Sequence, residues 1–316
     1  MSGADARRVA MIAGSGALPR AIANALGRAR VPWSACHLQG HVPQGVGQSR
    51  GFRIERFGGL LADLRGAGVT DVVLAGAIAR PTIDPSLVDE ATAPLVPRIA
   101  AAVGAGDDAA LRAIVAIIED AGMRVASVAD VAPELVDLPL AGEPSEGDRA
   151  DIARGRAVLE ALGPVDVGQA CVVAAGQVLA IEALPGTDWM LASLAPQAPQ
   201  PPVPRPPVPR APGARMGDAA RGGVFGGISD WLTGPGIARG LPSFPRPDGG
   251  VLVKMPKPGQ DLRVDMPAIG PDTVRRASAA GLSGIAVARG GVIALERGEM
   301  ADVLRGTSLF LHAFDA

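Results

Sequence analysis

The chain has 316 residues, a formal net charge of −2 and 48% hydrophobic residues, a composition typical of a soluble globular protein. The balanced charge argues against a broad basic surface for nucleic acid, and no run reaches the roughly 20 uncharged apolar residues that a transmembrane helix needs. The two cysteines, Cys36 and Cys171, lie far apart and suit neither a metal site nor a disulfide framework, so we expect a cytoplasmic protein.

The length predicts two domains, and the first 138 residues alternate apolar strands with helices. Apolar runs predict strands over residues 9–13, 71–76 and 125–128. Helices are predicted over residues 19–30, where Pro19 suits the first turn, and after residues 107–108 as far as Gly122. Strands separated by helices predict an α/β fold. The N-terminal domain, residues 1–138, would be a Rossmann-like parallel sheet that binds ligands at the carboxyl ends of its strands.

The turn Gly14-x-Gly16-x-x-Pro19 after the first strand is close to a dinucleotide-binding motif. It lacks the third glycine, and no acid that could bind a ribose stands around His37 and His41, at the end of the next strand. The pattern therefore argues against a nicotinamide-dependent oxidoreductase. Amides in such a turn can still bind a phosphate, and a tight turn without any ligand is the alternative.

Residues 150–316 predict a second, C-terminal α+β domain built of successive hairpins, after a linker over residues 139–149 that is rich in Pro, Gly and acids. Its helices are predicted over residues 151–162, from a cap at residues 186–188, and from Pro271. Its strands are predicted as a hairpin over residues 170–182, a second hairpin over residues 285–295 and a closing strand over residues 309–314.

Residues 195–248 form a Pro/Gly-rich insertion in this second domain. Its proline steps predict extended polyproline II and loop without a packed core, and a flexible solvated insertion is the main expectation. Two alternatives stay open. The PxxP steps could bind an aromatic groove of a partner, or a few apolar residues could contact lipid or cover the site: Phe225, Ile228, Trp231 and Leu232.

Lysine is rare in this chain. Only two of the 30 lysine and arginine residues are lysines, Lys254 and Lys257, and both lie in one short stretch. A lysine ammonium is a compact charge that suits a phosphate oxygen or a cramped site beside a metal. Two ordinary surface lysines beside a turn would give the same pattern.

Acidic residues follow the two lysines. Read as a strand, residues 261–266 place Asp261, Arg263 and Asp265 on one face and apolar side chains on the other. Two carboxylates on that face could hold a divalent cation or deprotonate a water. A half-solvated strand shows the same alternation without any chemistry, so the functional interpretation depends on the neighbouring lysines.

Several stretches, in chain order, resemble the LpxI family, which comprises UDP-2,3-diacylglucosamine diphosphatases of bacterial lipid A synthesis. They are Ile-Ala-Gly-Ser-Gly-Ala-Leu-Pro at residues 12–19, Leu-Ala-Gly-Ala-Ile-Ala-Arg-Pro at 74–81, Gly-Asp-Asp-Ala-Ala-Leu-Arg at 106–112, Asp-Val-Gly-Gln at 166–169, Glu182, Gly-Thr-Asp at 186–188, and the run from Lys254 to Gly270. The resemblance covers nearly the whole chain and implies a site between two domains. The long insertion departs from the family pattern, although the motifs on both sides of it are intact.

The resemblance implies hydrolysis of the pyrophosphate bond to UMP and 2,3-diacylglucosamine 1-phosphate (lipid X), with Mg²⁺ or another divalent cation. Asp265 would be the metal ligand or base, Asp261 would assist it as a second ligand, and Lys254, Lys257 and Arg263 would contact phosphate oxygens. The substrate-binding residues would be Gly14, Ser15, Gly16, Ala17, Leu18, Gly76, Ala77, Arg80, Pro81, Asp107, Asp108, Gln169, Glu182, Thr187, Asp188 and Gln260. The lipid-linked UDP-sugar implies transient, peripheral contact with the inner membrane, and a homodimer is left open.

A binding protein is the main alternative to an enzyme. A non-catalytic nucleotide-sugar-binding protein, tethered to a partner through its proline-rich segment, would bind the substrate and leave it unchanged. Deleting the insertion would then abolish capture of the partner. The clustered acids and lysines favour catalysis over binding alone.

Overall fold

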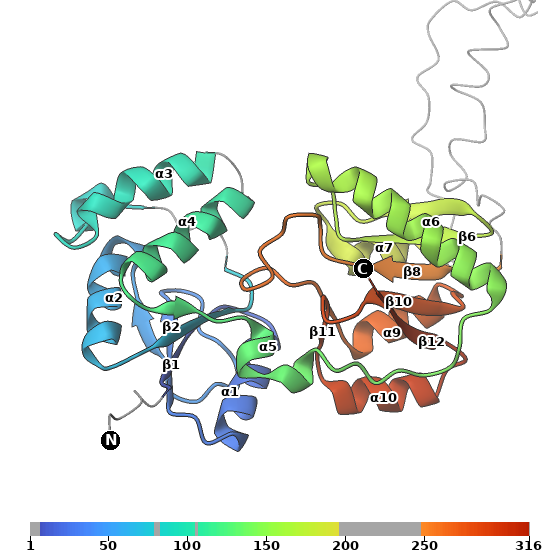
Figure 1. Cartoon of the computed structure of the whole chain (residues 1–316), viewed down its shortest axis with the longest axis horizontal. Helices are drawn as coiled ribbons and strands as arrows, with labels where there is room; N and C mark the ends of the chain where they lie inside the picture. The colour runs from blue at the N-terminus through green and yellow to red at the C-terminus, as the bar shows by residue number, and fades with distance from the viewer. Residues whose placement is uncertain (1–6, 79–82, 105–106, 196–247, 316) are drawn as a thin grey trace, which may run out of the picture.

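The computed structural model describes residues 7–78, 83–104, 107–195 and 248–315, and it forms two lobes, each built around a sheet (Figure 1). We call residues 7–135 the N-terminal lobe and residues 137–315 the C-terminal lobe. Arg80 and Pro81 lie outside the described residues, as do most residues of the Pro/Gly-rich insertion. None of the described helices is both long and apolar enough to cross a membrane.

The N-terminal lobe is a Rossmann-like parallel sheet, as predicted, with the strand order β3-β2-β1-β4-β5. Its strands are β1 (Val9–Ala13), β2 (Trp33–Leu38), β3 (Arg50–Phe52), β4 (Asp71–Ala75) and β5 (Arg124–Val125). Its α-helices are α1 (Leu18–Arg28), α2 (Phe57–Gly66), α3 (Val96–Gly104), α4 (Asp107–Asp120) and α5 (Val128–Val131). Short 3-10 helices lie at Ile54–Arg56, Pro85–Leu87, Ala93–Leu95 and Pro133–Leu135.

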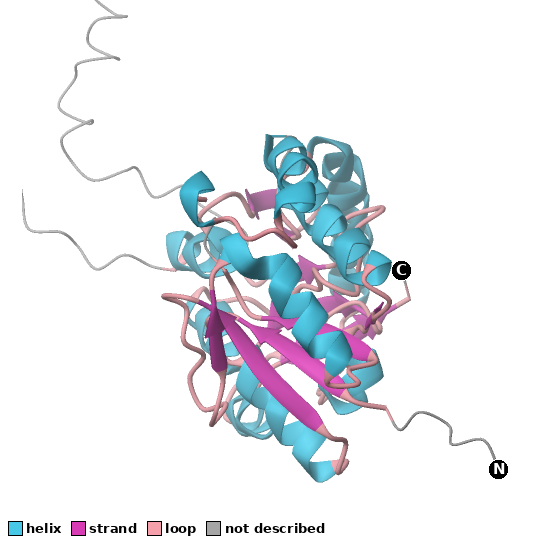
Figure 2. Ribbon diagram, turned by 90° about the vertical axis from the view of Figure 1, so that its left-hand side faces the viewer, coloured by secondary structure: helices cyan, strands magenta, loops and turns pink. Residues whose placement is uncertain are grey.

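Helices cover both faces of this sheet, as Figure 2 shows in a view onto the N-terminal lobe. Along β1, Val9 and Met11 pack with α1 and α5, whereas Ala10 and Ile12 pack with α2 and α4. All five residues of β1 are buried, as expected of a strand inside a doubly covered sheet. The strand predicted over residues 125–128 is shorter than expected, because Ser127 forms a capping box with Asp130 and starts α5.

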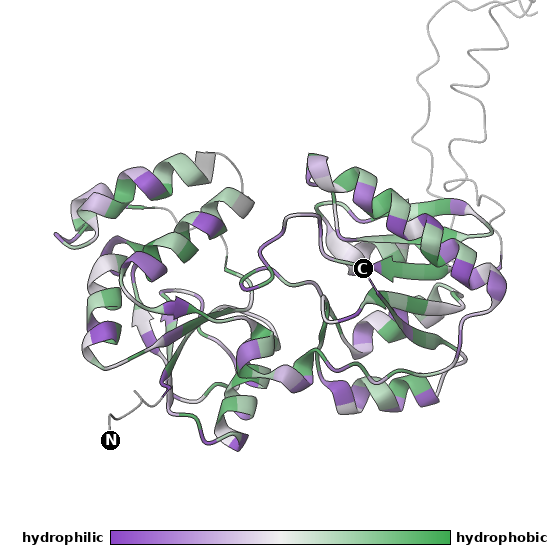
Figure 3. Ribbon diagram, in the orientation of Figure 1, coloured by the Kyte–Doolittle hydropathy of each residue, from purple (hydrophilic) through white to green (hydrophobic). Residues whose placement is uncertain are grey.

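The C-terminal lobe contains a mixed sheet of order β12-β10-β8-β6-β7. Its strands are β6 (Ala170–Ala174), β7 (Gln177–Ile181), β8 (Val251–Lys254), β10 (Gly284–Ala288) and β12 (Phe310–Phe314). Its α-helices are α6 (Glu146–Leu162), α7 (Gly186–Leu194), α9 (Pro271–Ala279) and α10 (Arg297–Arg305), and a 3-10 helix lies at Gly163–Val165. Figure 3 shows its central strands in hydrophobic colours and hydrophilic residues on the outer sides of the helices.

Two predictions for this lobe are wrong. Residues 285–295 do not form a hairpin, because β10 pairs in parallel with β8 and β12, whereas β11 (Ile293–Ala294) pairs with β9 (Ala268–Ile269) in a separate small sheet. All of β10 is buried between two apolar clusters, which suits a central strand rather than one arm of a surface hairpin. The lobe therefore contains one mixed sheet with parallel central strands, and the prediction of successive hairpins is overturned. The hairpin over residues 170–182 is confirmed as antiparallel β6 and β7.

The segment between the two main sheets belongs to both lobes. Ile293 of β11 lies in the same buried cluster as Val9 and Met11 of the N-terminal lobe, and Met266 packs against that cluster. Figure 1 shows the orange loop before β9, and β11 itself, between the lobes. Residues of the second half of the chain thus complete the core of the first lobe, which holds the two lobes together.

The predicted linker, residues 139–149, packs against the C-terminal lobe. The backbone groups of Ala141 and Leu311 exchange hydrogen bonds of 3.1 and 2.7 Å, so this part of the chain lies beside β12. Residues 146–149 are already helical, as the first turn of α6, which Ser145 and Asp148 cap.

A buried carboxylate on α6 holds the turn between β6 and β7. The side chain of Asp151 is 5% exposed, and its two oxygens accept the N–H groups of Ala175 at 3.0 Å and Gly176 at 2.7 Å. Both turn residues have positive φ, so the turn depends on such support. We expect Asp151→Ala to lower the free energy of unfolding by about 1–3 kcal/mol, measured by urea unfolding. Asp302→Ala, at an exposed helix position of the same lobe, should change it by less than about 0.5 kcal/mol. Equal losses in the two variants would contradict this role.

Candidate active site

The glycine turn after β1 and the end of β4 meet at the carboxyl edge of the first sheet. The N–H of Ser15 donates to the carbonyl of Ala77 at 2.9 Å, and the N–H of Ala77 donates to the carbonyl of Ser15 at 3.0 Å. A Cβ on Gly14 would lie 2.4 Å from the carbonyl oxygen of Ala77, and one on Gly76 would lie 2.4 Å from that of Ser15. Both glycines are therefore needed for the close approach of these two segments. The structure thus brings together two predicted groups of substrate residues, 14–18 and 76–77.

A pocket of about 400 Å³ is lined by Ala17 of the N-terminal lobe and by residues of the C-terminal lobe. Its lining is Ala17, Pro185, Gly186, Thr187, Asp188, Lys254, Ala268, Ile269, Gly270, Pro271, Asp272, Thr273, Leu295 and Glu296. The first residues of α7 and α9 and the residue before α1 are in this set. Free N–H groups at helix starts carry partial positive charge and favour an anionic ligand. The carboxylates of Asp188, Asp272 and Glu296 add negative charge to the same lining.

Lys254 supplies a full positive charge to this pocket. It is the last residue of β8 and is only 7% exposed. Its ammonium donates to the hydroxyl of Thr187 at 2.7 Å, and this hydroxyl donates to Oε1 of Glu182 at 2.5 Å. The other oxygen of Glu182 accepts the backbone N–H of Gln169 at 2.8 Å. Four predicted site residues therefore form one connected group, in which Gln169 takes part through its backbone.

Burial and charge act on Lys254 in opposite directions. Burial lowers the pKa of the Lys254 ammonium, and the negative charges of Glu182 and Asp188 partly counter that effect. Asp188 is the more solvent-exposed acid, with its side chain 60% exposed and 3.6 Å from the guanidinium of Arg276. The predicted cap at residues 186–188 is present as the start of α7, but Thr187 uses its hydroxyl for Glu182 and does not cap the helix.

The stretch over residues 261–266 is a turn and not the predicted strand. The carbonyl of Asp261 accepts the N–H groups of Val264 at 3.1 Å and Asp265 at 3.0 Å. The carboxylate of Asp261 also accepts the backbone N–H of Arg263 at 3.1 Å. Such a local side-chain bond competes with strand pairing, which explains the difference. Asp261, Arg263 and Asp265 therefore do not share one face of a strand, and that prediction is wrong.

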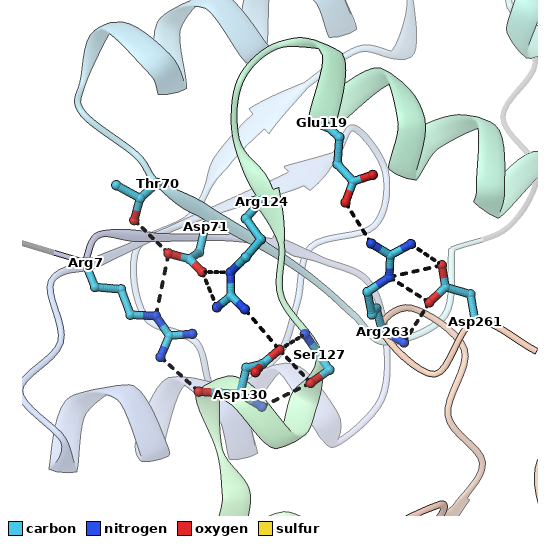
Figure 4. Close-up of polar contacts among 9 residues, drawn as sticks. All are labelled: Arg7, Thr70, Asp71, Glu119, Arg124, Ser127, Asp130, Asp261 and Arg263. Carbon is cyan, nitrogen blue, oxygen red and sulfur yellow. Dashed lines mark hydrogen bonds and ion pairs between the residues drawn. The ribbon is translucent and has the colours of Figure 1, made fainter. Parts of the chain in front are cut away.

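Asp261 and Arg263 form an ion pair that reaches the N-terminal lobe. The guanidinium of Arg263 donates to Oδ1 of Asp261 at 2.9 Å and to Oδ2 at 2.7 Å, and its third nitrogen donates to Glu119 of α4 at 2.7 Å (Figure 4). The hydrogen bonds from Arg263 lower the pKa of Asp261. Figure 4 also shows a separate network around Asp71 and Arg124, near the first residues of β4 and β5. The Arg263 contacts tie the loop to α4.

The remaining predicted residues of this loop are held within the C-terminal lobe. The ammonium of Lys257 pairs with the carboxylate of Asp166, which has a left-handed backbone. The side chain of Gln260 accepts the N–H of Lys257 at 2.8 Å and donates to Oδ2 of Asp265. Gln260 therefore fixes the orientation of Asp265. None of these loop residues lines the pocket. Of the five predicted catalytic residues, Lys254 is the one in the pocket lining.

The described residues offer few side-chain ligands for a metal ion. They include no group of three or more His, Cys, Asp or Glu side chains placed to hold a metal ion. Both oxygens of Asp261 accept bonds from Arg263, whereas Asp265 accepts a side-chain bond from Gln260 on Oδ2. Magnesium usually takes one or two carboxylates and completes its shell with waters and substrate phosphates. Asp265 fits that pattern, and Asp261 would fit it only after its pair with Arg263 opens.

Sequence reasoning missed the part of the pocket that α9 contributes. Residues 268–273 and the pair Leu295 and Glu296 were not predicted as site residues, although a helix from Pro271 was. A helix start directly after the lysine and aspartate stretch was the available signal, because helix starts commonly bind anions. The side chains of Asp107 and Asp108 lie outside the described part of the structure, and only their place at the start of α4 is known.

The fold and the pocket define a two-lobed α/β protein whose pocket is lined by Lys254, by the starts of α7 and α9, and by Ala17 before α1. The model of the LpxI N-terminal domain matches residues 8–135, and that of the LpxI C-terminal domain matches residues 137–203 and 233–312. The chain therefore belongs to the LpxI family. It is 30% identical over 315 residues, which are 98% of each chain, to the UDP-2,3-diacylglucosamine pyrophosphatase LpxI of Caulobacter vibrioides. The interval between the two parts of the C-terminal match lies inside the predicted insertion.

Proposed function

We propose that this protein hydrolyses the pyrophosphate bond of UDP-2,3-diacylglucosamine to UMP and 2,3-diacylglucosamine 1-phosphate. The observation that carries the proposal is the pocket between the lobes, where the Lys254 ammonium and three helix starts face one cavity. Family membership and the relative's name give the reaction. A pyrophosphate has the dense negative charge that such a pocket stabilises.

Charge neutralisation is the task of the pocket residues. The pyrophosphate group gains charge on the leaving oxygen as the bond breaks, and fixed positive groups lower the energy of that state. Lys254 supplies a full charge, and the N–H groups at the starts of α7 and α9 supply partial charges. The glycine turn at Gly14 to Gly16 would hold the substrate from the N-terminal lobe.

Asp265 is the residue that we propose to handle the water. Its carboxylate would accept the proton of the attacking water or bind a divalent cation, with Gln260 fixing its orientation. Bound magnesium would neutralise phosphate oxygens and lower the pKa of a water. Lys257 and Arg263 are paired with Asp166 and Asp261, so in this arrangement they hold the loop in place.

The proposal predicts both products and a need for metal. With Mg²⁺ present, the full chain should convert UDP-2,3-diacylglucosamine into UMP and the sugar 1-phosphate, identified by mass spectrometry. Excess chelator should abolish the reaction, and added Mg²⁺ should restore it. The described side chains supply few metal ligands, so the substrate phosphates must complete the coordination shell of the ion and a chelator can remove it. Release of UDP instead of UMP would contradict cleavage of the pyrophosphate. An unchanged rate in chelator would contradict the metal dependence alone.

We also propose transient contact with a membrane surface, because the substrate carries two acyl chains. The pocket-lining residues 185–188 are flanked by Leu184, which is fully exposed, and by Trp189, which is 63% exposed. Tryptophan is enriched at membrane interfaces. The double variant Leu184→Ser, Trp189→Ser should sediment less with vesicles of phosphatidylethanolamine and phosphatidylglycerol, while substrate dispersed in detergent is still hydrolysed. Val165→Ser, at another exposed apolar position, is the control. Equal sedimentation of wild type and double variant would refute this surface.

A further inference from the structure

Two hydrogen bonds connect Lys254 through Thr187 to Glu182. We propose that Thr187 and Glu182 are positioning residues, which hold the Lys254 ammonium at the pocket wall so that its other N–H groups can bind a substrate phosphate. The inference rests on the proposed hydrolysis. In this proposal Thr187 and Glu182 affect the substrate only through Lys254, whereas the family resemblance implied that they contact the substrate directly.

The chemistry of the three groups fixes the direction of the hydrogen bonds. An ammonium only donates, so the hydroxyl of Thr187 must accept from Lys254. The single hydroxyl proton then points to Oε1 of Glu182, which as a carboxylate only accepts. An ammonium has three donors, and Thr187 takes one of them. The other two are available on the side of the pocket, because Lys254 belongs to its lining.

The far end of this chain of bonds is anchored by backbone. The second oxygen of Glu182 accepts the N–H of Gln169 at 2.8 Å, just before β6. Gly168 packs so closely there that a Cβ on it would lie 2.1 Å from the carbonyl oxygen of Glu182. Thr187 is buried in the first turn of α7. The segment before β6 holds Glu182 and the first turn of α7 holds Thr187, which favours a preorganised ammonium.

Glu182 is the acid best placed to keep the lysine charged. The three acids that line the pocket are each paired with an arginine: Asp188 with Arg276 at 3.6 Å, Asp272 with Arg275 at 2.7 Å, and Glu296 with Arg20 at 2.6 Å. Glu182 has backbone and hydroxyl donors instead, and it is less exposed than Asp188. Burial lowers the pKa of Lys254, so removing the Glu182 charge should let the ammonium lose its proton at a still lower pH.

The rarity of lysine allows a direct test by NMR. The full chain, labelled with ¹³C and ¹⁵N in lysine, should give one Nζ signal for each of its two lysines. The signal that disappears in Lys257→Arg belongs to Lys257, which assigns the other to Lys254. In Glu182→Gln, which keeps the size of the side chain, we expect the titration midpoint of Lys254 to fall by about one pH unit or more. Thr187→Ser keeps the hydroxyl and should retain the wild-type midpoint, whereas Thr187→Val should lower it. An unchanged midpoint in Glu182→Gln would overturn the inference.

Kinetics give the second readout. In Glu182→Gln and Thr187→Val, the alkaline limb of the pH profile of kcat should move to lower pH. In Thr187→Ser, which keeps the hydroxyl, it should stay at the wild-type position. Thr307→Val is the matched control, because the Thr307 hydroxyl donates to the carbonyl of Leu304 after α10, and its profile should equal that of wild type. If wild type releases no UMP, the proposed hydrolysis fails. If wild type is active but the limb does not move in Glu182→Gln, only the positioning role fails.

Discussion

Replacing Asp265 with alanine is expected to lower the rate of UMP release by roughly 100- to 10,000-fold, the usual contribution of a positioned acid or base. Asp265 is half-buried in a loop between the lobes, and Gln260 holds its carboxylate. The loss of the carboxylate removes the proposed proton acceptor or metal ligand without opening a large cavity. The melting temperature should therefore change by only a few degrees, and steady-state kinetics with circular dichroism would measure both effects.

The matched variants separate charge from shape. Asp265→Asn keeps an oxygen that can accept from Gln260 but removes the charge, and it should lose nearly as much activity as Asp265→Ala. Asp261→Asn weakens the pair with Arg263 and should lower activity less, since Asp261 is occupied by that guanidinium. Near-normal turnover in Asp265→Ala, or a larger loss in Asp261→Asn, would contradict the assignment of the central carboxylate.

Replacing Lys254 with glutamine should lower kcat by about 100- to 1,000-fold, the usual effect of removing one group that stabilises developing charge. Lys254→Arg should not restore the rate, because a planar guanidinium is larger than an ammonium and the Lys254 side chain is buried. The folded state should tolerate the loss of this buried charge, as measured by urea unfolding, because burial of the ammonium is itself unfavourable.

Lys257 is the natural comparison for Lys254, since the chain has no third lysine. Its ammonium is paired with Asp166 and lies outside the pocket lining. Lys257→Gln should therefore cost clearly less activity than Lys254→Gln. Wild-type kcat in Lys254→Gln, or a larger loss in Lys257→Gln, would move the proposed phosphate contact from the pocket to the loop.

The N-terminal lobe could be predicted from sequence because its signals are local. Five consecutive buried residues form β1, the glycine turn follows at once, and α1 begins next to Pro19. The helix predicted after residues 107–108 as far as Gly122 is confirmed by α4. In a doubly covered parallel sheet, buried strands and amphipathic helices alternate, so the chain pattern and the fold carry the same information.

The C-terminal lobe was harder because short apolar runs do not specify their partners. The buried run of β10 fits a hairpin arm and a central parallel strand equally well, and pairing with β8 and β12 decides between them. The turn at Asp261 likewise has the polar–apolar alternation of a strand in its sequence. In the structure, Asp261 and Arg263, two residues apart, are instead hydrogen-bonded to each other within the turn. For β10 the deciding contacts are with strands distant in the sequence, whereas for the turn they are local bonds of Asp261 that an alternating pattern does not reveal.

The predicted site residues could be named from the sequence, but their arrangement in space could not. Lys254, Thr187 and Glu182 do lie together, although the resemblance and not spacing grouped them. The pocket wall from α9 and the contact of Arg263 with Glu119 join segments far apart in the chain, and the sequence carries no direct signal for such pairs. The rarity of lysine singles out Lys254 and Lys257, and of these two only Lys254 lines the pocket.

The most direct test of the central claim is release of UMP from UDP-2,3-diacylglucosamine by the purified full-length protein in the presence of magnesium. The proposal predicts steady release of UMP with an equal amount of 2,3-diacylglucosamine 1-phosphate. Folded protein that binds the nucleotide sugar and returns it unchanged, with every divalent cation tried, would contradict hydrolysis and would support a binding protein instead.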